Sequence, residues 1–309
     1  MTSSNSSHSS SSSQPKPLRK AIIPVAGLGT RVLPASKAIP KEMLPVVDKP
    51  VIQHVVEEAA AAGFTEIILV SRSGKSAIED HFDVHYELES ELSRKNKQDL
   101  LESVQHTLPA GVNISTVRQA KALGLGHAVL CAAPLVANED FAVILPDMLI
   151  PDISGQASDL SQMVAAYRQH GCGQIMVEAV PEDKVERYGI VDCADQSPAP
   201  GSCANIVDMV EKPKPADAPS NLSINGRYIL PARVMELLTQ TKAGAGGEIQ
   251  LTDAMANLIE EGGQLMAYTM QSKSYDCGNK AGYLEANLVY GLAHPETKDS
   301  LRALVKDLI

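Results

Sequence analysis

The sequence predicts an α/β protein whose central sheet is mixed but mainly parallel. Short apolar runs of strand length alternate with longer segments in which apolar residues recur at helical spacing. This alternation is typical of right-handed crossovers on a mainly parallel sheet. Later in the chain, strand-like runs at 174–180, 188–191 and 206–210 follow one another without a helix between them. Their succession indicates some antiparallel pairing.

The first half of the chain supplies the parallel part of this sheet. A strand at residues 20–25 leads into a glycine turn, and a helix begins near Pro50 and ends at Gly63, where glycine commonly closes a helix. Further strands are expected at 66–70, 112–118 and 141–145, further helices near Ser76 and at 128–135, and an exposed helical excursion at 86–108.

The second half adds a helix at 158–170 before the run of strands described above, and then a further strand at 224–230. Helices around 234–238 and 251–259, a strand at 265–270 and a terminal helical region complete the chain. No internal repeat or long linker interrupts it, so we expect one continuous domain over 18–295 and a helical extension at 296–309. The serine-rich residues 1–17 are too polar to bury and are expected to be disordered.

Composition excludes several classes of function. The 37 Asp and Glu residues outnumber the 27 Lys and Arg residues and give a net charge of -10, which leaves no basic face for duplex nucleic acid or anionic lipid. No apolar run approaches the ~20 residues that span a bilayer. The 5 cysteines are odd in number and form no Cys-x-x-Cys pair, which fits neither a disulfide framework nor a zinc site. We therefore expect a cytoplasmic protein that binds neither nucleic acid nor membrane.

The glycine turn after the first strand is typical of a phosphate-binding loop. Gly27 and Gly29 can adopt backbone angles closed to other residues and let bare N–H groups approach a ligand, while Arg31 adds a permanent forked cation. Residues 27–50 contain four basic residues, Lys41 among them, against two acidic ones, in a chain that is acidic overall. This local inversion of charge points to an anionic ligand.

Two familiar phosphate loops do not fit, although a purely structural turn stays open. A dinucleotide-binding loop needs a third glycine, whereas position 32 is valine, and Pro34 and Pro40 argue against a helix directly after the turn. No Gly-Lys-Ser/Thr follows four residues after a glycine, so the loop is not that of a P-loop ATPase.

Two aspartates are candidate magnesium ligands. Asp147 follows the buried strand 141–145, and the carboxyl ends of strands are where open α/β sheets bind ligands. Asp276 lies at the end of another strand-like stretch, and magnesium commonly takes one or two protein carboxylates together with substrate phosphates. The alternative is that either aspartate merely caps a turn. The neighbouring Cys277 lacks a histidine partner, and we expect a buried, inert thiol rather than a nucleophile.

The tripeptide Glu211-Lys212-Pro213 begins where a strand ends, because the proline cannot continue a central ladder. A lysine that offsets phosphate charge, beside a glutamate that accepts hydrogen bonds from hydroxyls, suits a phosphorylated sugar. An exposed charged turn is the alternative. His127 is equally consistent with contact to a ligand and with a structural helix start, and we assign it no catalytic role.

Together these motifs resemble the bacterial UTP–glucose-1-phosphate uridylyltransferases, members of the sugar nucleotidyltransferase family. The resemblance covers about residues 18–295 and rests on segments in a fixed order: 26–31 (AGLGTR), 40–45 (PKEMLP), 118–119, 124–127, 145–147 (LPD), 188–189, 210–213 (VEKP), 248–253 (EIQLTD) and 276–279 (DCGN). It implies a Rossmann-like three-layer nucleotidyltransferase fold.

The resemblance also implies a reaction and the residues that perform it. An oxygen of glucose 1-phosphate would attack the α-phosphorus of UTP in line, giving UDP-glucose and pyrophosphate with the assistance of Mg2+. By the family's pattern Arg31 and Lys41 would hold the UTP phosphates and Lys212 the sugar phosphate, as the catalytic cations. Asp147 and Asp276 would bind the metal.

The remaining implied contacts concern the base and the sugar. The nucleotide-binding set comprises Ala26, Gly27, Gly29, Thr30, Gln119 and Gly124, and the sugar-binding set comprises Gly189, Glu211 and Lys212. The family also implies a homodimer or homotetramer. A thymidylyltransferase, another hexose-1-phosphate nucleotidyltransferase, a weakly active regulatory paralogue and a dinucleotide-dependent oxidoreductase stand as alternatives. The pair Thr30-Arg31 argues against the regulatory paralogue, which lacks it.

Overall fold

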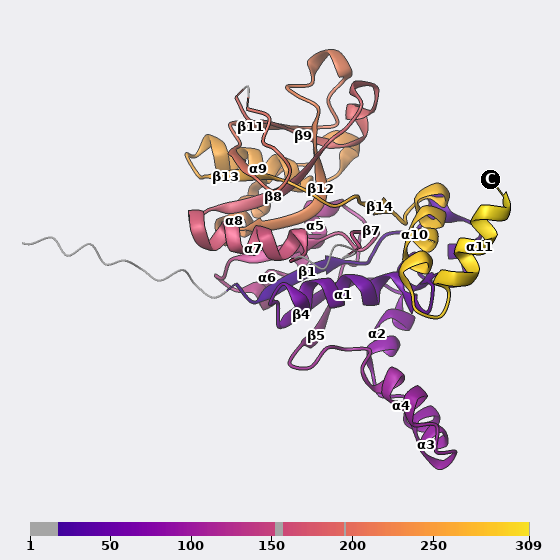
Figure 1. The fold of residues 1–309 in the computed structure, drawn as a ribbon. Helices are drawn as coiled ribbons and strands as arrows, with labels where there is room; N and C mark the ends of the chain where they lie inside the picture. Colours follow the sequence, from indigo (N-terminus) through magenta and orange to yellow (C-terminus); the bar gives the residue numbers. More distant parts are fainter. Residues whose placement is uncertain (1–17, 152–156, 195, 309) are drawn as a thin grey trace, which may run out of the picture.

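The structure is a computed structural model that describes residues 18–151, 157–194 and 196–308. The serine-rich segment 1–17 lies outside the described residues. A single large sheet runs through the molecule (Figure 1). Its strands are β1 (Lys20–Pro24), β4 (Glu66–Ser71), β5 (Asn113–Arg118), β6 (Phe141–Ile144), β8 (Gly173–Ala179), β10 (Cys203–Asn205), β12 (Leu222–Leu230) and β13 (Leu265–Thr269), with β9 (Gly189–Asp192) and β11 (Asp208–Glu211) attached beside β12.

The sheet is mixed and mainly parallel, as predicted. The strand order is β10-β13-β8-β12-β6-β1-β4-β5. Strands β6, β1, β4 and β5 are parallel neighbours, and β8 and β13 pair in parallel with each other. Only β12 and β10 run against this direction along the described path, since β12 pairs antiparallel with both β6 and β8, and β10 with β13.

Helices cover both faces of the sheet and produce three layers. The helices beside the sheet are α1 (Val51–Ala61), α2 (Ser76–Phe82), α5 (Leu125–Cys131), α6 (Ala133–Val136), α7 (Asp159–His170), α8 (Arg233–Gln240) and α9 (Leu251–Glu260). One hydrophobic cluster contains side chains of α1 and α7, and the other contains side chains of α5, α8 and α9. The Rossmann-like architecture predicted from the resemblance is therefore confirmed.

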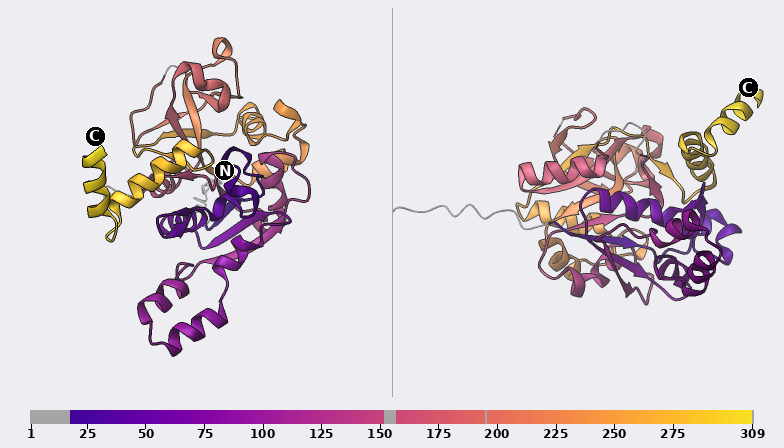
Figure 2. Two further views of the ribbon diagram at one scale, coloured as in Figure 1. Left: turned by 90° about the vertical axis from the view of Figure 1, so that its right-hand side faces the viewer. Right: turned by 60° about the horizontal axis from the view of Figure 1, so that its bottom comes forward.

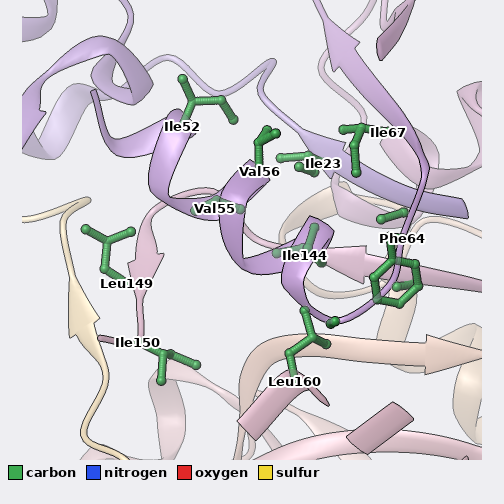
Figure 3. Close-up of a cluster of buried hydrophobic side chains, with 14 of the residues drawn as sticks. Ile23, Ile52, Val55, Val56, Phe64, Ile67, Ile144, Leu149, Ile150 and Leu160 are labelled. Atoms are coloured by element: carbon green, nitrogen blue, oxygen red, sulfur yellow. The ribbon is translucent and has the colours of Figure 1, made fainter. Parts of the chain in front are cut away.

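Strand β1 illustrates how the alternation of a strand builds both core clusters. Ile23 points into the cluster under α1, where it lies near Val55 and Val56 (Figure 3), while its neighbour Ile22 belongs to the cluster on the opposite face. All of these side chains are fully buried. Because both faces are covered, the strand reads as a continuous apolar run rather than as an alternating one.

Two helical segments extend beyond the sheet. Helices α3 (Tyr86–Arg94) and α4 (Gln98–Gln105) form a hairpin that projects away from the body (Figure 2), in the segment where an exposed excursion was predicted. Helices α10 (Lys280–Ala293) and α11 (Lys298–Leu308) lie together at the carboxyl end of the described chain. Within the described ranges, no helix is both long and apolar enough to cross a bilayer.

Short elements account for most differences from the predicted order. The predicted helix at 128–135 is divided into α5 and α6, and β10 was not anticipated. Two-residue strands form two small ribbons: β2 (Pro45–Val46) with β3 (Lys49–Pro50), and β7 (Met148–Leu149) with β14 (Tyr275–Asp276). Strands this short carry no readable alternation, so sequence periodicity does not reveal them.

Candidate active site

The candidate residues meet at one edge of the sheet, at the carboxyl ends of its parallel strands. The phosphate loop follows β1, Gln119 follows β5 and Asp147 follows β6. After β1, the chain adds β4 and β5 on one side and then returns to place β6 on the other side. In open α/β sheets this reversal opens a crevice between the two strands, and ligands bind there.

The phosphate loop is shaped by glycine and by three short helical turns. Gly29 has a φ of 67°, in the left-handed region, and its carbonyl accepts a hydrogen bond of 2.7 Å from Ser36 Oγ. A Cβ atom on Gly29 would lie 3.3 Å from Lys41 Cβ, so the loop packs closely on the segment that carries this lysine. Single 3-10 turns at Thr30–Val32, Ala35–Lys37 and Lys41–Met43 replace the continuous helix of a dinucleotide-binding fold.

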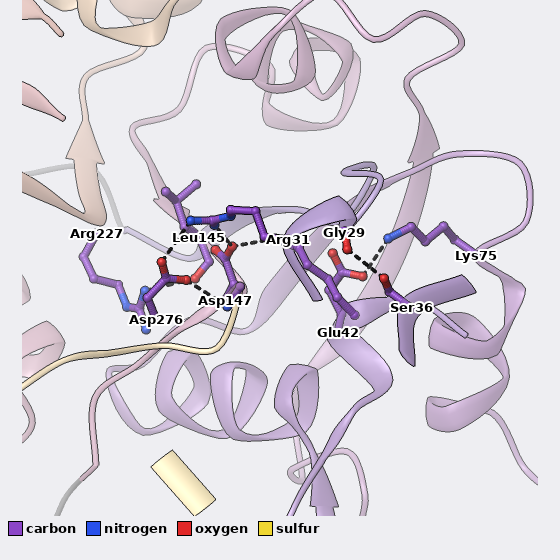
Figure 4. A network of polar contacts seen from close by, with 11 residues as sticks. Gly29, Arg31, Ser36, Glu42, Lys75, Leu145, Asp147, Arg227 and Asp276 are labelled. Atoms are coloured by element: carbon purple, nitrogen blue, oxygen red, sulfur yellow. Dashed lines mark hydrogen bonds and ion pairs between the residues drawn. The ribbon is translucent and has the colours of Figure 1, made fainter. Parts of the chain in front are cut away.

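Two cations and two carboxylates converge beside this loop, and Figure 4 shows three of them, Arg31, Asp147 and Asp276. Arg31 donates through Nη1 to Asp276 Oδ2 at 3.1 Å and through Nη2 to Asp147 Oδ2 at 3.4 Å. Lys41 Nζ lies 2.5 Å from the same Asp147 oxygen. The structure thus brings the predicted Arg31 and Lys41 together with two predicted aspartates that lie more than a hundred positions further along the chain.

The electrostatics of this cluster keep Asp147 ionised. Burial favours the neutral acid, but the ammonium of Lys41 and the guanidinium of Arg31 outweigh it and hold the pKa of Asp147 below its ordinary value. Its side chain is 16% exposed, whereas that of Arg31 is 59% exposed. Arg31 is therefore the member of the cluster that an incoming ligand meets first.

The ribbon of β7 and β14 places Asp276 next to Asp147. Asp276 pairs with Met148 in this ribbon, and Cys277 donates its backbone N–H to Asp147 O at 2.7 Å. Gly278 donates its backbone N–H to Asp276 Oδ1 at 2.8 Å, which fixes the orientation of that carboxylate. The two aspartates are thereby held by backbone contacts as well as by their shared guanidinium.

The pair of carboxylates fits a magnesium ion. A Cβ atom on Gly278 would lie 2.5 Å from both Asp147 Oδ2 and Arg31 Nη2, so only glycine fits against this cluster. Across the described ranges, no three His, Cys, Asp or Glu side chains form a potential metal cluster. Magnesium suits such a site, because it takes oxygen ligands and usually completes its shell with water and phosphate.

A cavity of about 360 Å3 opens on the loop side of Asp147. Gln119 is 8% exposed and donates through Nε2 to Gly124 O at 3.1 Å, with His127 Nδ1 at 3.0 Å. This leaves Gln119 Oε1 to accept from a ligand. Gly124 has a φ of 100°, and a Cβ atom there would lie 2.8 Å from Ile249 O. The predicted nucleotide residues that line this cavity are Ala26, Gly27, Gln119 and Gly124, whereas Gly29 and Thr30 do not line it.

A smaller cavity of about 210 Å3 adds two basic residues that the sequence interpretation missed, Arg72 and Lys75. It is lined by Lys37, Lys41, Arg72 and Lys75, and it shares Lys41 with the neighbouring cavity. Lys75 is paired with the buried Glu42 at 2.6 Å, and burial lowers the pKa of this lysine. The sequence feature that could have identified Arg72 is its position directly after β4, at the ligand-bearing edge of the sheet.

A larger cavity of about 610 Å3 lies on the other side of Asp147. Asp147 and Leu145 line both large cavities, so the cation and carboxylate cluster separates them. Arg31, Asp276 and Tyr188 also line the larger one. Its polar lining further includes Glu178, Lys184, Arg187, Asn225 and Ser274.

The predicted sugar residues form their own group on β9 and β11. Gly189 pairs with Glu211 where β9 and β11 run antiparallel, and Thr252 donates to Glu211 Oε2 at 2.7 Å. Lys212 Nζ lies 3.3 Å from Glu211 Oε1 and its side chain is 48% exposed. Its backbone N–H donates to Tyr188 O at 3.0 Å. The group borders the larger cavity through Tyr188, and Gly189, Glu211 and Lys212 are not themselves among its lining residues.

Cys277 has the properties of an inert thiol. Its side chain is 2% exposed, and burial, reinforced by Asp147 and Asp276, raises its pKa to about 12. A thiol with this pKa stays protonated near neutral pH, whereas the thiolate is the nucleophilic form. A nucleophilic role for Cys277 therefore has no support in the geometry of the site.

Residues 20–291 match the model of the nucleotidyl transferase family. The UTP–glucose-1-phosphate uridylyltransferase of Haemophilus influenzae is 50% identical over 291 residues, or 94% of this chain and 98% of that protein. The UTP-bound UGPase from Acinetobacter baumannii is 51% identical with a TM-score of 0.88, covering 94% of this chain and 100% of that one. A UDP-glucose pyrophosphorylase complexed with UDP-glucose is 41% identical with a TM-score of 0.79, covering 90% and 100%.

Proposed function

Because the chain belongs to the nucleotidyl transferase family and, within it, to the UTP–glucose-1-phosphate uridylyltransferases, we propose that it converts UTP and glucose 1-phosphate into UDP-glucose and pyrophosphate. One observation carries this proposal. Arg31, Lys41, Asp147 and Asp276 converge between two cavities, at the edge where a parallel sheet reverses its strand order. Such a site can hold two anionic substrates with their phosphates facing one another.

The residues at this point act by positioning and by charge, without a covalent intermediate. An oxygen of the sugar phosphate attacks the α-phosphorus of UTP, and the bond to the β-phosphate breaks as pyrophosphate leaves. Arg31 offers a fork of N–H donors to phosphate oxygens, and Lys41 adds a compact charge beside it. Fixed cations of this kind stabilise the charge that develops on the transferring group. The buried thiol of Cys277, whose pKa is raised by burial, stays protonated beside the site, in agreement with this chemistry.

The cavity of about 360 Å3 suits the uracil base. Gln119 Nε2 is engaged by Gly124 O at 3.1 Å, so its Oε1 accepts from the N3–H of the base. The missing side chain at Gly124 lets the backbone approach the ring edge, and Ala26 and Gly27 also line this cavity. Thymine carries the same N3–H, and the names of the relatives at 50% and 51% identity favour UTP over dTTP.

Magnesium is the cofactor that the two carboxylates favour. We assign its protein ligands to Asp147 and Asp276, supported by the shared contact of both carboxylates with Arg31, which brings them together. The ion would supply positive charge to the phosphates of both substrates. Arg31 and Lys41 orient the same phosphates from the loop side. The backbone hydrogen bond from Cys277 N–H to Asp147 O holds the segments of the two aspartates side by side.

The glucose 1-phosphate side is assigned to the larger cavity and its border. Glu211, fixed by Thr252 at 2.7 Å, retains a carboxylate oxygen for sugar hydroxyls, and Gly189 permits close backbone approach. Lys212 is 48% exposed, and we assign it to the sugar phosphate. Its pairing with Glu211 at 3.3 Å is long enough to be exchanged for a ligand.

A pyrophosphate-release assay tests this function. Purified protein is supplied with UTP or dTTP and with glucose 1-phosphate or its galactose and mannose counterparts, with and without Mg2+. We expect magnesium-dependent release with UTP and glucose 1-phosphate, at least tenfold faster than with dTTP. Faster turnover of dTTP would identify a thymidylyltransferase instead, and no release with any pair would favour a regulatory protein.

The proposal extends to assembly and compartment. Leu284 and Leu288 lie one helical turn apart on α10 and are 67% and 43% exposed, and Leu304 and Leu308 on α11 are 52% and 76% exposed. Such apolar helix faces support a homodimer or homotetramer. Sedimentation of Leu284→Lys against the native chain tests this. An unchanged mass of the assembly would show that Leu284 on α10 does not form the interface. The five cysteines are all unpaired, which supports the reducing cytoplasm, to be checked by cell fractionation.

A further inference from the structure

A buried arginine outside the predicted site is bound to the turn that carries Asp147. We propose that Arg227, held by Glu58, is a positioning residue that fixes the carboxylate of Asp147 in the cation cluster. This inference rests on the proposed function, because it concerns the reaction in which Asp147 takes part. Arg227 lies on β12, next to the end of β6, and is drawn with Leu145, Asp147 and Asp276 in Figure 4.

Arg227 is 0% exposed, yet every donor of its guanidinium has an acceptor. Nε and Nη2 donate to the two oxygens of Glu58 at 2.9 and 2.7 Å. Nη1 donates to Leu145 O at 3.1 Å and Gly226 O at 3.3 Å, and Nη2 donates to Met148 O at 2.7 Å. A guanidinium has five N–H groups, and these five contacts use all of them.

The carbonyls of Leu145 and Met148 belong to the turn that presents Asp147. Leu145 and Met148 flank it, and the turn begins where the pairing of β6 with β12 ends at Ile144. Beyond that point β12 no longer pairs with this segment, and the guanidinium of Arg227 binds the carbonyls of Leu145 and of Met148, where β7 begins. The turn is closed from its other sides by Leu145 N–H to Gly226 O at 2.8 Å and by Cys277 N–H to Asp147 O at 2.7 Å.

A close backbone approach makes this arrangement possible. Gly226 has a φ of 56°, and a Cβ atom there would lie 3.2 Å from Leu145 Cβ and 3.3 Å from Met148 Cγ. The register of β12 shifts between Ile224 and Tyr228, around this glycine. The irregularity brings β12 against the turn and directs the guanidinium of Arg227 beneath it.

A purely structural role would be served better by other residues. Buried ion pairs are often no more stabilising than apolar side chains of similar volume, because both charges lose their hydration. A guanidinium does what an apolar group does not, since it binds two carbonyls at fixed angles. Glu58, 10% exposed on α1, neutralises the charge and orients the fork. The pair of Arg227 and Glu58 thus links α1 to the turn that carries Asp147.

Three variants test the proposal. Arg227→Lys keeps a charge but loses the fork, and the double variant Arg227→Met with Glu58→Met replaces the pair by apolar side chains that leave no unpaired charge. We expect both to lower kcat at least tenfold with a KM for UTP within threefold, because the turn loses its alignment while the base cavity is intact. In an Asp147→Glu background the carboxylate is already displaced. There, adding Arg227→Lys should lower kcat by less than a further threefold.

A readout independent of turnover is the binding of Mn2+ in the presence of UTP, followed by electron paramagnetic resonance. We expect at least fivefold weaker binding in the double variant, and this measurement decides alone if Asp147→Glu is inactive. Lys20→Met is the matched control, since Lys20 is 7% exposed and caps the carbonyls of Leu135 and Val136 at the other end of β1. It should lower the melting temperature without changing kcat.

Two results would overturn the positioning role. One is an equal loss of kcat from Arg227→Lys with and without Asp147→Glu, and the other is unaltered Mn2+ binding in a folded double variant. If the native chain itself shows no pyrophosphate release, the proposed function fails instead. The two failures are distinguishable, because Mn2+ binding reports on the turn even then.

Discussion

The substitution Arg31→Ala isolates the residue on which the activity most directly depends. In the free protein, its guanidinium is 59% exposed and contacts Asp276 at 3.1 Å and Asp147 at 3.4 Å. Neither contact is needed to hold the loop, which is fixed by the packing of Gly29 against Ser36 and by buried Val32. The variant should therefore fold normally while it lacks the cation that meets the triphosphate first.

The magnitude follows from the contacts that are lost. A guanidinium facing a phosphate makes up to two charge-assisted hydrogen bonds, each contributing about 1.5–3 kcal/mol. The 59% exposure of Arg31 places the sum near the lower limit, because solvent screens the interaction. The loss of about 3 kcal/mol corresponds to a fall of roughly 100-fold in kcat/KM for UTP. Arg31→Lys keeps the charge but loses the fork, and its kcat/KM for UTP should lie between those of the native chain and Arg31→Ala.

The assay is initial-rate release of pyrophosphate at saturating glucose 1-phosphate and varied UTP. Arg94→Ala is the matched control, since Arg94 on α3 forms a comparable two-point pair with Glu91 at 2.9 and 2.7 Å but lies on the projecting hairpin. It should retain native kcat/KM. If Arg31→Ala stays within threefold of the native rate while its melting temperature is unchanged, the assignment of Arg31 to the triphosphate is wrong.

Three further outcomes follow from single features of the site and its surroundings. Gly278→Ala should abolish turnover with little loss of stability, because its Cβ would lie 2.5 Å from both Arg31 Nη2 and Asp147 Oδ2; native activity would show that the space is not used. Cys277→Ala should retain at least half of kcat, and alkylation of the native protein should spare this thiol, whose pKa burial raises to about 12; inactivation would revive the nucleophile. Burial lowers the pKa of His54, so the folded state excludes a proton that the unfolded chain takes up below about pH 6.5. The melting temperature should therefore fall as pH drops through that range, and it should fall less steeply in His54→Gln. An equal dependence of melting temperature on pH in both proteins would show that His54 is not the cause.

The part of the site that could be predicted from sequence is the part made by long strands. Asp147 follows a buried run that reads clearly as a strand, and a parallel sheet brings the carboxyl ends of its strands together. The same logic placed Arg31 and Lys41 after β1. It also applied to Arg72, which follows β4 and lines the small cationic cavity together with Gly74, but the sequence interpretation did not extend to this loop.

The remainder depends on contacts that have no sequence period. Asp276 reaches Asp147 through β14, a strand of two residues that pairs antiparallel with β7. Arg227 reads as an ordinary basic residue in an apolar strand, and its role depends on a break in register that only the folded sheet contains. Glycine at 278 is informative only once both carboxylates are in place around it. Local pattern thus predicts where loops meet, whereas close backbone approaches decide which side chains touch.

The charge balance of the cluster leads to a last prediction, on the coupling between metal and nucleotide. Arg31 and Lys41 carry two positive charges and Asp147 and Asp276 two negative ones, so the four neutralise each other in the free protein. The cations become free for phosphate only when the carboxylates have another partner, and coupling of this kind is reciprocal. Calorimetry should therefore find UTP binding at least tenfold tighter with Mg2+ than without it. In the Asp147→Asn, Asp276→Asn double variant, where both cations lose their carboxylates, the affinity for UTP should become independent of Mg2+. If the double variant keeps the native dependence on Mg2+, the carboxylates do not restrain Arg31 and Lys41, and the metal acts on the nucleotide alone.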